Sequence, residues 1–317
     1  MIAFVFPGQG AQYAGMGREL ARAFPESRAV YDRADSILGF SLSTLCWEGP
    51  EERLAQTEIT QPAILTTSIA ALAVLQGRGL RCGMVAGLSL GEYSALVAAA
   101  AMRLEDALPL VRSRGRFMQD AASGRATAMA AILGIDAADI IAVCRRASAK
   151  GVVQPANFNS PGQTVIAGEQ AAVEEAIVLA KAAGAKRAVR LPVSAPFHTS
   201  LMAPAAERLA PLVEQVALRP PQVPIVSNVS AQATRSPDEI RRLLVAQVSS
   251  AVQWDASVRA MADMGVSTFV EVGPGSTLSG LIRKIAPGAR TLRVEDPETL
   301  TETLAALGER AEAHGSA

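Results

Sequence analysis

The 317-residue sequence predicts an α/β fold, in which a large parallel-sheet domain is interrupted by a small inserted domain. Half of the residues are hydrophobic but only 4% are aromatic, so the core must be built from aliphatic side chains, which suits helices packed on a parallel sheet. Short apolar segments that end in turn residues alternate with helical segments, and this alternation is typical of a parallel sheet. A different order of elements occupies the middle of the sequence.

The outer parts of the sequence carry the alternating pattern. An apolar run at 2–6 ends in the turn sequence Pro7-Gly8-Gln9-Gly10 and predicts the first strand. Another strand is predicted at 83–87, and helices are predicted at 14–24, 26–38, 50–55, 61–77, 92–102 and 104–121. Two later apolar runs, 224–228 and 268–272, also end in turn residues and precede helical sequence, as expected of strands in the same sheet.

The middle of the sequence predicts a separate small domain. Its strands and helices are expected in the order strand 127–133, helix 137–148, strand 152–158, strand 163–167, helix 170–183 and strand 186–191. This βαββαβ order is the ferredoxin-like pattern. We therefore assign 125–193 to a ferredoxin-like domain and 1–124 with 194–317 to the large domain. The cleft between the two is the expected substrate site.

Composition excludes several classes of function. The 30 basic and 30 acidic residues balance, which argues against a nucleic-acid or membrane-surface protein. Three cysteines, Cys46, Cys82 and Cys144, are odd in number and far apart, as expected of free thiols in the cytoplasm, and they offer no metal-ligand spacing. The N-terminus lacks a basic region and predicts a strand rather than a signal peptide. We interpret the sequence as having no apolar run that approaches about 18 residues without charge, and we therefore expect no transmembrane helix. We expect no cofactor and no metal.

The segment Gly87-Leu88-Ser89-Leu90-Gly91 is a G-x-S-x-G sequence between a predicted strand and a predicted helix. Such a turn places the serine hydroxyl at a strained, exposed apex, where the next backbone N–H and the helix N-terminus face a developing oxyanion. This arrangement is typical of a nucleophile in an α/β-hydrolase-like domain. The alternative is an ordinary strand-to-helix turn, in which the serine only caps the helix.

Histidine is scarce, and this limits the choice of a catalytic base. The chain has two histidines, His198 and His314, and the second lies in a small-residue tail expected to fray. If an imidazole activates Ser89, the base is therefore His198, in a proline-containing loop after a predicted strand. The alternative is that His198 has only a structural role.

The helix expected at 104–121 places one arginine on its apolar face. At 100° per residue Arg114 falls within the apolar arc, whereas Arg112 and Arg116 fall outside it. A buried guanidinium needs an acceptor. That acceptor is either an internal Asp or Glu, in a structural salt bridge, or the carboxylate of a substrate, which the planar guanidinium can bind with two hydrogen bonds.

Taken together, ordered motifs over nearly the whole chain resemble the malonyl-CoA:acyl-carrier-protein transacylase family, the stand-alone acyltransferases of fatty acid and polyketide synthesis. The similar segments are Phe6-Pro7-Gly8-Gln9-Gly10-Ala11-Gln12, Gly87-Leu88-Ser89-Leu90-Gly91-Glu92-Tyr93, Arg114-Gly115 with Met118-Gln119, Asn157-Phe158-Asn159-Ser160-Pro161-Gly162-Gln163, Pro196-Phe197-His198, Gln247 with Val252-Gln253-Trp254, and Glu271-Val272-Gly273-Pro274-Gly275.

The resemblance implies a catalytic set. Ser89 would carry the malonyl ester, and His198 would act first as general base and then as the acid that protonates the leaving thiol. Backbone amides of Gln9 and Leu90 would form the oxyanion hole. A carbonyl fills the third position of the triad in this family, and Gln247 is the matching residue.

The resemblance also implies substrate contacts. Arg114 would pair with the malonyl carboxylate, and Asn159 would contact the substrate from the small domain. Phe197 resembles the bulky residue of malonyl-selective relatives, which leaves little room for an α-methyl group. One departure is Leu88, where many relatives carry histidine; we expect it to alter packing near the apex rather than abolish the chemistry.

We therefore predict ping-pong transfer of malonyl from malonyl-CoA to the phosphopantetheine thiol of acyl carrier protein, by a cytoplasmic monomer for which coenzyme A is part of the substrate rather than a cofactor. One alternative is an acyl-thioester hydrolase or esterase, which would use the same serine and histidine but gain nothing from Arg114. Others are a stand-alone acyltransferase serving a polyketide synthase and a non-catalytic module that binds carrier protein.

Overall fold

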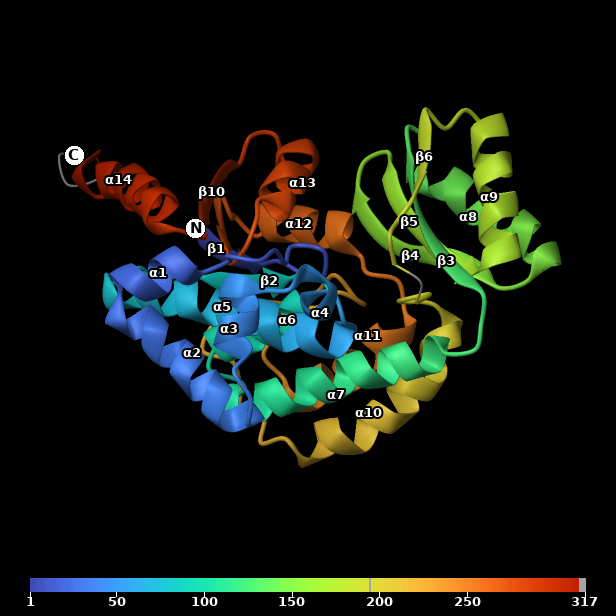
Figure 1. Ribbon diagram of the computed structural model, residues 1–317. Helices are drawn as coiled ribbons and strands as arrows, with labels where there is room; N and C mark the ends of the chain where they lie inside the picture. Colours follow the sequence, from blue (N-terminus) through green and yellow to red (C-terminus); the bar gives the residue numbers. More distant parts are fainter. Residues whose placement is uncertain (194, 314–317) are drawn as a thin grey trace.

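The computed structural model describes residues 1–193 and 195–313 and contains two β-sheets, each with its own helices (Figure 1). The predicted second start of the large domain, at 194, and the predicted tail with His314 lie outside the described residues. The α/β fold class predicted from the sequence is confirmed.

The larger sheet has six strands in the order β10-β9-β1-β2-β7-β8. The strands are β1 (Ile2–Phe6), β2 (Met84–Gly87), β7 (Ile225–Val226), β8 (Ala233–Thr234), β9 (Thr268–Val272) and β10 (Arg290–Val294). All neighbours are parallel except β7 and β8, which pair antiparallel at one edge. Phe6 is level with Gly87, so the turns that follow β1 and β2 leave the sheet side by side.

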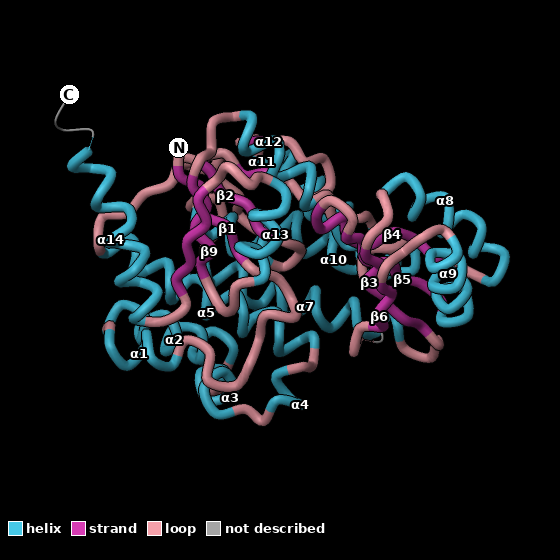
Figure 2. The backbone as a smooth tube through the Cα atoms, turned by 90° about the horizontal axis from the view of Figure 1, so that it is seen from above, coloured by secondary structure: helices cyan, strands magenta, loops and turns pink. Residues whose placement is uncertain are grey.

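Helices cover both faces of this sheet (Figures 1 and 2). They are α1 (Arg18–Ala23), α2 (Pro25–Leu38), α3 (Leu42–Glu48), α4 (Glu51–Leu54), α5 (Thr57–Gly77), α6 (Gly91–Ala98), α7 (Leu104–Ala122), α10 (Ala203–Gln215), α11 (Pro237–Ser249), α12 (Trp254–Asp263), α13 (Thr277–Ile285) and α14 (Pro297–Ala313). In β1 the side chains alternate between two cores: Phe4 and Phe6 join the one formed with α5–α7, and Ala3 and Val5 join the one formed with α12 and α13.

Helix α5 corrects the expectation that no apolar run approaches about 18 residues without charge. Residues 59–77 carry no charge, and α5 is long and apolar enough to cross a membrane by length and composition. However, 89% of its most apolar window is buried inside the protein, because the helix packs against α2, α6 and α7 beneath the sheet. The long apolar segment is therefore the central helix of the core.

The smaller sheet has four antiparallel strands in the order β4-β5-β3-β6. They are β3 (Thr127–Leu133), β4 (Val153–Ser160), β5 (Gln163–Glu169) and β6 (Arg187–Arg190), and α8 (Ala137–Ala147) and α9 (Gln170–Ala182) pack on them. A short 3₁₀ turn, η1 (Ser148–Lys150), follows α8, and another, η2 (Ser200–Met202), precedes α10. The predicted βαββαβ order is present, and its four strands lie within 125–193, whereas the exact domain limits stay a prediction.

Hydrogen bonds join strand β4 of the small sheet to two segments outside that sheet. The Val252 amide donates to the carbonyl of Ala156 at 2.9 Å, and the Val252 carbonyl accepts from the amide of Phe158 at 2.9 Å. The side-chain oxygen of Gln154, on the same strand, accepts from the Ser200 amide at 2.7 Å. Strand β4 is therefore bonded to the segment after α11 and to the segment after His198.

Several elements differ from the sequence-based expectation. Helices α3, α12 and α14 and strands β8 and β10 were not predicted. The two strands were missed because β10 is a half-buried, mixed polar strand and β8 has two residues. Helix α5 begins at Thr57 rather than 61 and runs through Pro62, which removes only one helical hydrogen bond. Helix α6 ends at Ala98 rather than 102, because Ala100 adopts a left-handed conformation with φ 56°.

Candidate active site

The turn between β2 and α6 requires the two glycines of its motif. A Cβ atom on Gly87 would lie 2.0 Å from the carbonyl of Gly91, and one on Gly91 would lie 2.1 Å from the carbonyl of Phe6. This close packing forces Ser89 into the left-handed region at φ 53°, which a non-glycine residue rarely adopts. The strained apex that the sequence predicts is therefore present, with Ser89 buried rather than exposed.

His198 lies next to the serine in an orientation that suits a base. Its Nε2 is 2.7 Å from the Ser89 hydroxyl, and its Nδ1 is 2.8 Å from the backbone carbonyl of Gln247. Because a carbonyl only accepts, Nδ1 carries the proton and Nε2 is free to accept one from the serine. Burial, with a smaller contribution from the charge of Arg114, lowers the pKa of His198 from 6.5 to about 4, so the imidazole is neutral at physiological pH.

Two backbone amides beside the serine are free to bind an anion. Among the described residues, no atom accepts a hydrogen bond from the amide of Gln9 or of Leu90. A Cβ on Gly8 would lie 2.3 Å from the carbonyl of Leu88, so the glycine lets the turn after β1 pack directly on the turn after β2. The fold thus brings Gln9 and Leu90 to the same end of the sheet, with unpaired N–H donors.

Arg114 is buried on α7 and reaches the same serine. Its guanidinium donates to Ser89 Oγ at 3.2 Å, Gln247 Oε1 at 2.8 Å and Gln61 Oε1 at 2.9 Å, and it lies 5.5 Å from the ring centre of Tyr93. Burial lowers its pKa. None of the ion pairs among the described residues includes Arg114. A structural salt bridge, one of the two roles considered from the sequence, therefore does not account for this cation.

The side chain of Gln247 connects these groups. Besides accepting from Arg114, it donates through Nε2 to the Ser89 carbonyl at 3.0 Å and to Glu92 Oε2 at 2.6 Å. The resemblance pointed to a carbonyl at this position, and the backbone carbonyl of Gln247 does lie against His198. The additional bonds of its side chain were not expected.

Sequence reasoning missed three buried residues of the site. Asn228, at the end of β7, accepts from the Ser89 amide at 2.6 Å and donates to the Gly87 carbonyl at 2.6 Å. Gln61 of α5 holds Arg114, and Glu92 of α6 holds Gln247. The sequence contained a signal for two of them. Glu92 directly follows Gly91 of the G-x-S-x-G segment, and Asn228 ends a predicted strand that lies next to β2 in the sheet.

A cavity of about 390 Å³ lies beside Gln9 and Phe197, between the turn after β1 and the loop that leads to His198. Amide side chains of Gln56 and Gln119 contribute to its lining. Phe197 is nearly buried at its edge. Of the predicted site residues, Gln9 and Phe197 line this cavity, whereas Ser89, His198 and Arg114 do not.

The remaining predicted residues have different surroundings. Asn159 lies on β4, and the structure joins it to none of the other predicted site residues; its side-chain oxygen is buried without a hydrogen-bond partner. Leu88 packs against the core formed by β1, β2, α12 and α13, in agreement with a packing role.

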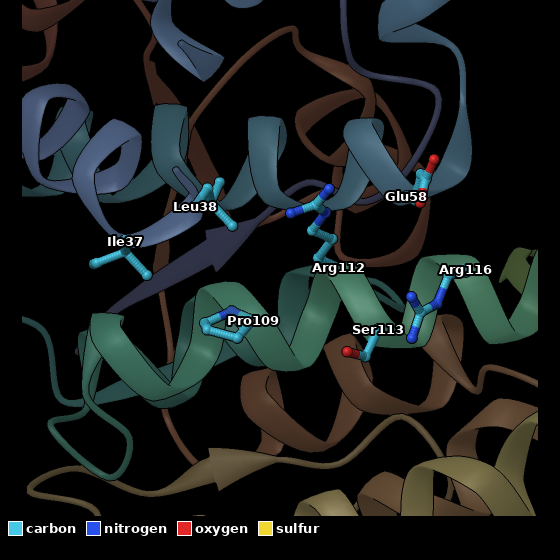
Figure 3. A pocket seen from close by; sticks show the side chains of 7 residues that line it. All are labelled: Ile37, Leu38, Glu58, Pro109, Arg112, Ser113 and Arg116. Carbon is cyan, nitrogen blue, oxygen red and sulfur yellow. The ribbon is translucent and has the colours of Figure 1, made fainter. Parts of the chain in front are cut away.

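A second cavity, of about 280 Å³, lies on the other face of α7 (Figure 3). Arg112 and Arg116 of α7 line it together with Ile37 and Leu38 of α2, and with Glu58 of α5. The two arginines thus point away from Arg114, as the helical periodicity predicts. None of the predicted site residues lines this cavity.

No group of three or more His, Cys, Asp or Glu side chains within the described part of the chain could hold a metal ion. The expectation of neither metal nor cofactor stays a prediction.

Comparison with known proteins identifies close relatives. A family model described as acyl transferase domain matches residues 3–296. Malonyl CoA-acyl carrier protein transacylase of Bacillus subtilis (strain 168) is 46% identical over 309 residues, which are 97% of this chain and 98% of that protein. The crystal structure of the transacylase of the same name from Clostridium perfringens has a TM-score of 0.96 and 41% identity, and covers 99% of both chains.

A third relative comes from the structure of a type II PKS acyl-carrier protein in complex with its malonyl-transacylase. The similar chain is 43% identical, with a TM-score of 0.94, and the match covers 96% of the present chain and 99% of that chain.

Proposed function

The chain belongs to the malonyl-CoA:acyl-carrier-protein transacylase family, and we propose that it transfers malonyl from malonyl-CoA to the phosphopantetheine thiol of an acyl carrier protein. One observation carries this proposal: the hydroxyl of Ser89 lies between a neutral imidazole at 2.7 Å and a buried guanidinium at 3.2 Å. The first is the arrangement of an acyl-transfer nucleophile, and the second is a receptor for an acyl group that carries a carboxylate.

In the first half-reaction the Ser89 oxygen attacks the thioester carbonyl, and the hydroxyl proton moves to Nε2 of His198. The amides of Gln9 and Leu90 donate to the oxyanion of the tetrahedral intermediate. When the intermediate collapses, the carbon–sulfur bond breaks and the proton on His198 passes to the leaving sulfur of coenzyme A. The carrier-protein thiol then attacks the malonyl ester and gives its proton to His198, which returns it to Ser89.

Arg114 would exchange one partner when the acyl group arrives. The malonyl carboxylate lies two carbon–carbon bonds from the acyl carbon, so it reaches the guanidinium that bonds to the serine in the free enzyme. We assign Phe197 to limiting the room beside the α-carbon and Asn159 to a contact with the substrate from the small domain. Steric exclusion of one methyl group gives about 1–3 kcal/mol of discrimination.

The proposal is tested by incubation with malonyl-CoA and measurement of the intact mass. We expect one malonyl group on the wild type and none on Ser89→Ala. The matched control is Ser94→Ala, because Ser94 is buried on the helix that follows Ser89, has no hydrogen-bond partner among the described residues and should be dispensable for the adduct. Absence of an adduct on the wild type would indicate a binding module. An adduct that reacts with water as fast as with carrier-protein thiol would indicate a hydrolase.

We further propose that the protein acts in the cytoplasm, as a monomer and without a cofactor. The three cysteines are free, and burial raises the pKa of Cys46 to about 12, of Cys82 to about 11 and of Cys144 to about 12, so these thiols are poorly reactive. The relative seen with a type II PKS carrier protein supports a polyketide synthase as a second destination for the malonyl group.

A further inference from the structure

The buried cation of the site has only neutral partners. Arg114 is 1% exposed, and the atoms that accept its hydrogen bonds belong to Gln61, Ser89 and Gln247, all uncharged. Its Nε, also buried, has no partner among the described residues. A buried charge without compensation is costly, so a counter-charge is expected nearby.

Glu92 is the buried carboxylate closest to this cation in the network. It is 3% exposed, and its Oε2 accepts from Gln247 Nε2 at 2.6 Å and from the Asn228 amide at 3.2 Å. The other buried glutamate among the described residues, Glu271, binds the amides of Leu278 and Ser279 instead. Glu92 is therefore the carboxylate that can compensate Arg114.

The amide of Gln247 lies between the two charges. Its oxygen accepts from the Arg114 guanidinium at 2.8 Å, and its nitrogen donates to the Glu92 carboxylate at 2.6 Å. The opposite orientation would place NH₂ against the cation and oxygen against the anion, so the pair of charges fixes which way the amide points. The backbone carbonyl of the same glutamine receives Nδ1 of His198.

We propose that Glu92 is a positioning residue: it fixes Gln247 for His198 and Ser89, and it serves as the counter-charge of Arg114 until the carboxylate of the acyl group takes that place. The proposal rests on the malonyl-transfer function proposed above. It adds a consequence, because the loaded site would hold two carboxylates and one guanidinium, so Glu92 takes up a proton from water when malonyl binds.

The surroundings of Glu92 support this proton uptake. Burial raises the pKa of Glu92 to about 7, against the lowering effect of its hydrogen bonds and of Arg114. The other titratable groups near it are neutral at pH 7: the pKa of Tyr93 is raised to about 12, and that of His198 is lowered to about 4. A second anion raises the pKa of Glu92 further, so malonyl binding favours its protonated form. Consequently, kcat/KM for malonyl-CoA falls as the pH rises through 7.

The test compares Glu92→Gln, which keeps an acceptor for Gln247 and removes the charge, with the wild type. We expect kcat/KM of the wild type to fall by up to about tenfold per pH unit above 7, and that of Glu92→Gln to stay level between pH 7 and 8. Glu92→Ala, which removes the acceptor as well, should lower kcat by about 100-fold, because Gln247 and His198 lose their alignment. Glu271→Gln is the matched control and should keep the wild-type pH dependence.

A direct measurement counts protons with an indicator dye in weak buffer at pH 7, while malonyl-CoA acylates the enzyme. Acylation alone moves the Ser89 proton to the coenzyme A thiol and changes no net count. We expect the wild type to take up a fraction of one proton per malonyl group and Glu92→Gln to take up none. Equal uptake in both, or the same pH profile in both, would overturn the role of Glu92. Failure of the wild type to form the malonyl adduct would overturn the proposed function instead.

Discussion

Two turns that follow parallel strands of the large sheet are built in nearly the same way, but they differ in backbone strain and in how their amides are paired. In each, a parallel strand runs through a glycine-containing turn into a helix, with a buried glutamate close by: β2, Ser89 and α6 with Glu92, and β9, Gly273 and α13 with Glu271. In the second turn Glu271 itself fills the helix N-terminus, accepting from the Leu278 and Ser279 amides at 3.0 and 2.8 Å.

The first turn leaves one amide beside its helix N-terminus without an acceptor. The Leu90 amide has no acceptor among the described residues, and Glu92 points instead to Gln247 and to the Asn228 amide. Its left-handed position is occupied by a serine, whereas glycines take those positions in the second turn, with φ 129° at Gly273 and φ 82° at Gly275. A turn with an unpaired N–H donor and a reactive side chain in a strained conformation suits catalysis. A turn whose own glutamate accepts from the helix amides contributes to stability instead.

The largest expected effect comes from substitutions at the positive-φ positions of the two turns, which should change activity in one turn and stability in the other. Ser89→Gly should abolish malonyl transfer, a loss on the order of 10⁶-fold in kcat, yet raise the free energy of unfolding by about 1 kcal/mol, because glycine accepts φ 53°. Gly273→Ala should instead lower the free energy of unfolding by about 3 kcal/mol, since its φ is 129° and its Cβ would lie 2.3 Å from Ser68 Oγ. Urea denaturation measures both, and a destabilised Ser89→Gly would contradict the comparison.

The second effect concerns the guanidinium of Arg114, which contacts Ser89 of the first turn. Arg114→Ala should lower kcat/KM for malonyl-CoA by about 100-fold and shift preference toward uncharged acyl groups, because a buried charge-assisted contact is lost. Arg112→Ala, on the opposite face of the same helix, is the control and should leave this ratio unchanged (Figure 3). Unchanged malonyl preference in Arg114→Ala would remove the carboxylate receptor from the proposal.

The smallest effect is on the pH dependence of stability. Burial raises the pKa of Glu92 to about 7, so the folded state holds its proton in the window in which the unfolded chain has lost it. Wild-type stability therefore falls between about pH 4.5 and 7 on account of Glu92, and Glu92→Gln should be more stable at pH 8 by about 1–3 kcal/mol.

His198 contributes a slope of the opposite sign, because its lowered pKa adds stability as the pH rises from about 4 to 6.5. This slope should be visible in Glu92→Gln. Glu271→Gln should lose about 1 kcal/mol, since an amide can accept only one of the two helix amides that the carboxylate holds. Thermal unfolding over the pH range measures the three curves, and a less stable Glu92→Gln at pH 8 would refute the assignment.

Local sequence was sufficient to predict the reactive turn, because its geometry depends on glycines within five residues of each other. The small sheet was likewise predictable from its regular alternation of elements. The partners of the turn were harder to find: Asn228 and Gln247 are 139 and 158 residues from Ser89, and Gln61 reaches Arg114 from another helix. Such contacts depend on how helices pack on the sheet, which periodicity does not specify. Helix α5 was difficult for a related reason, since an uncharged helix at the centre of a core resembles a membrane span.

The hydrogen bonds that Val252 and Ser200 form with strand β4 have a consequence for replacing the small domain by that of a relative. A chimera that replaces only residues 125–193 would pair a foreign strand β4 with the native segment after α11. Val252 lies five residues after Gln247, whose carbonyl accepts from the imidazole of His198. The Val252 bonds join backbone atoms, and the Ser200 amide needs the side-chain oxygen of Gln154. A graft intended to alter partner choice should therefore keep Gln at 154 and the backbone register of β4 at 156–158.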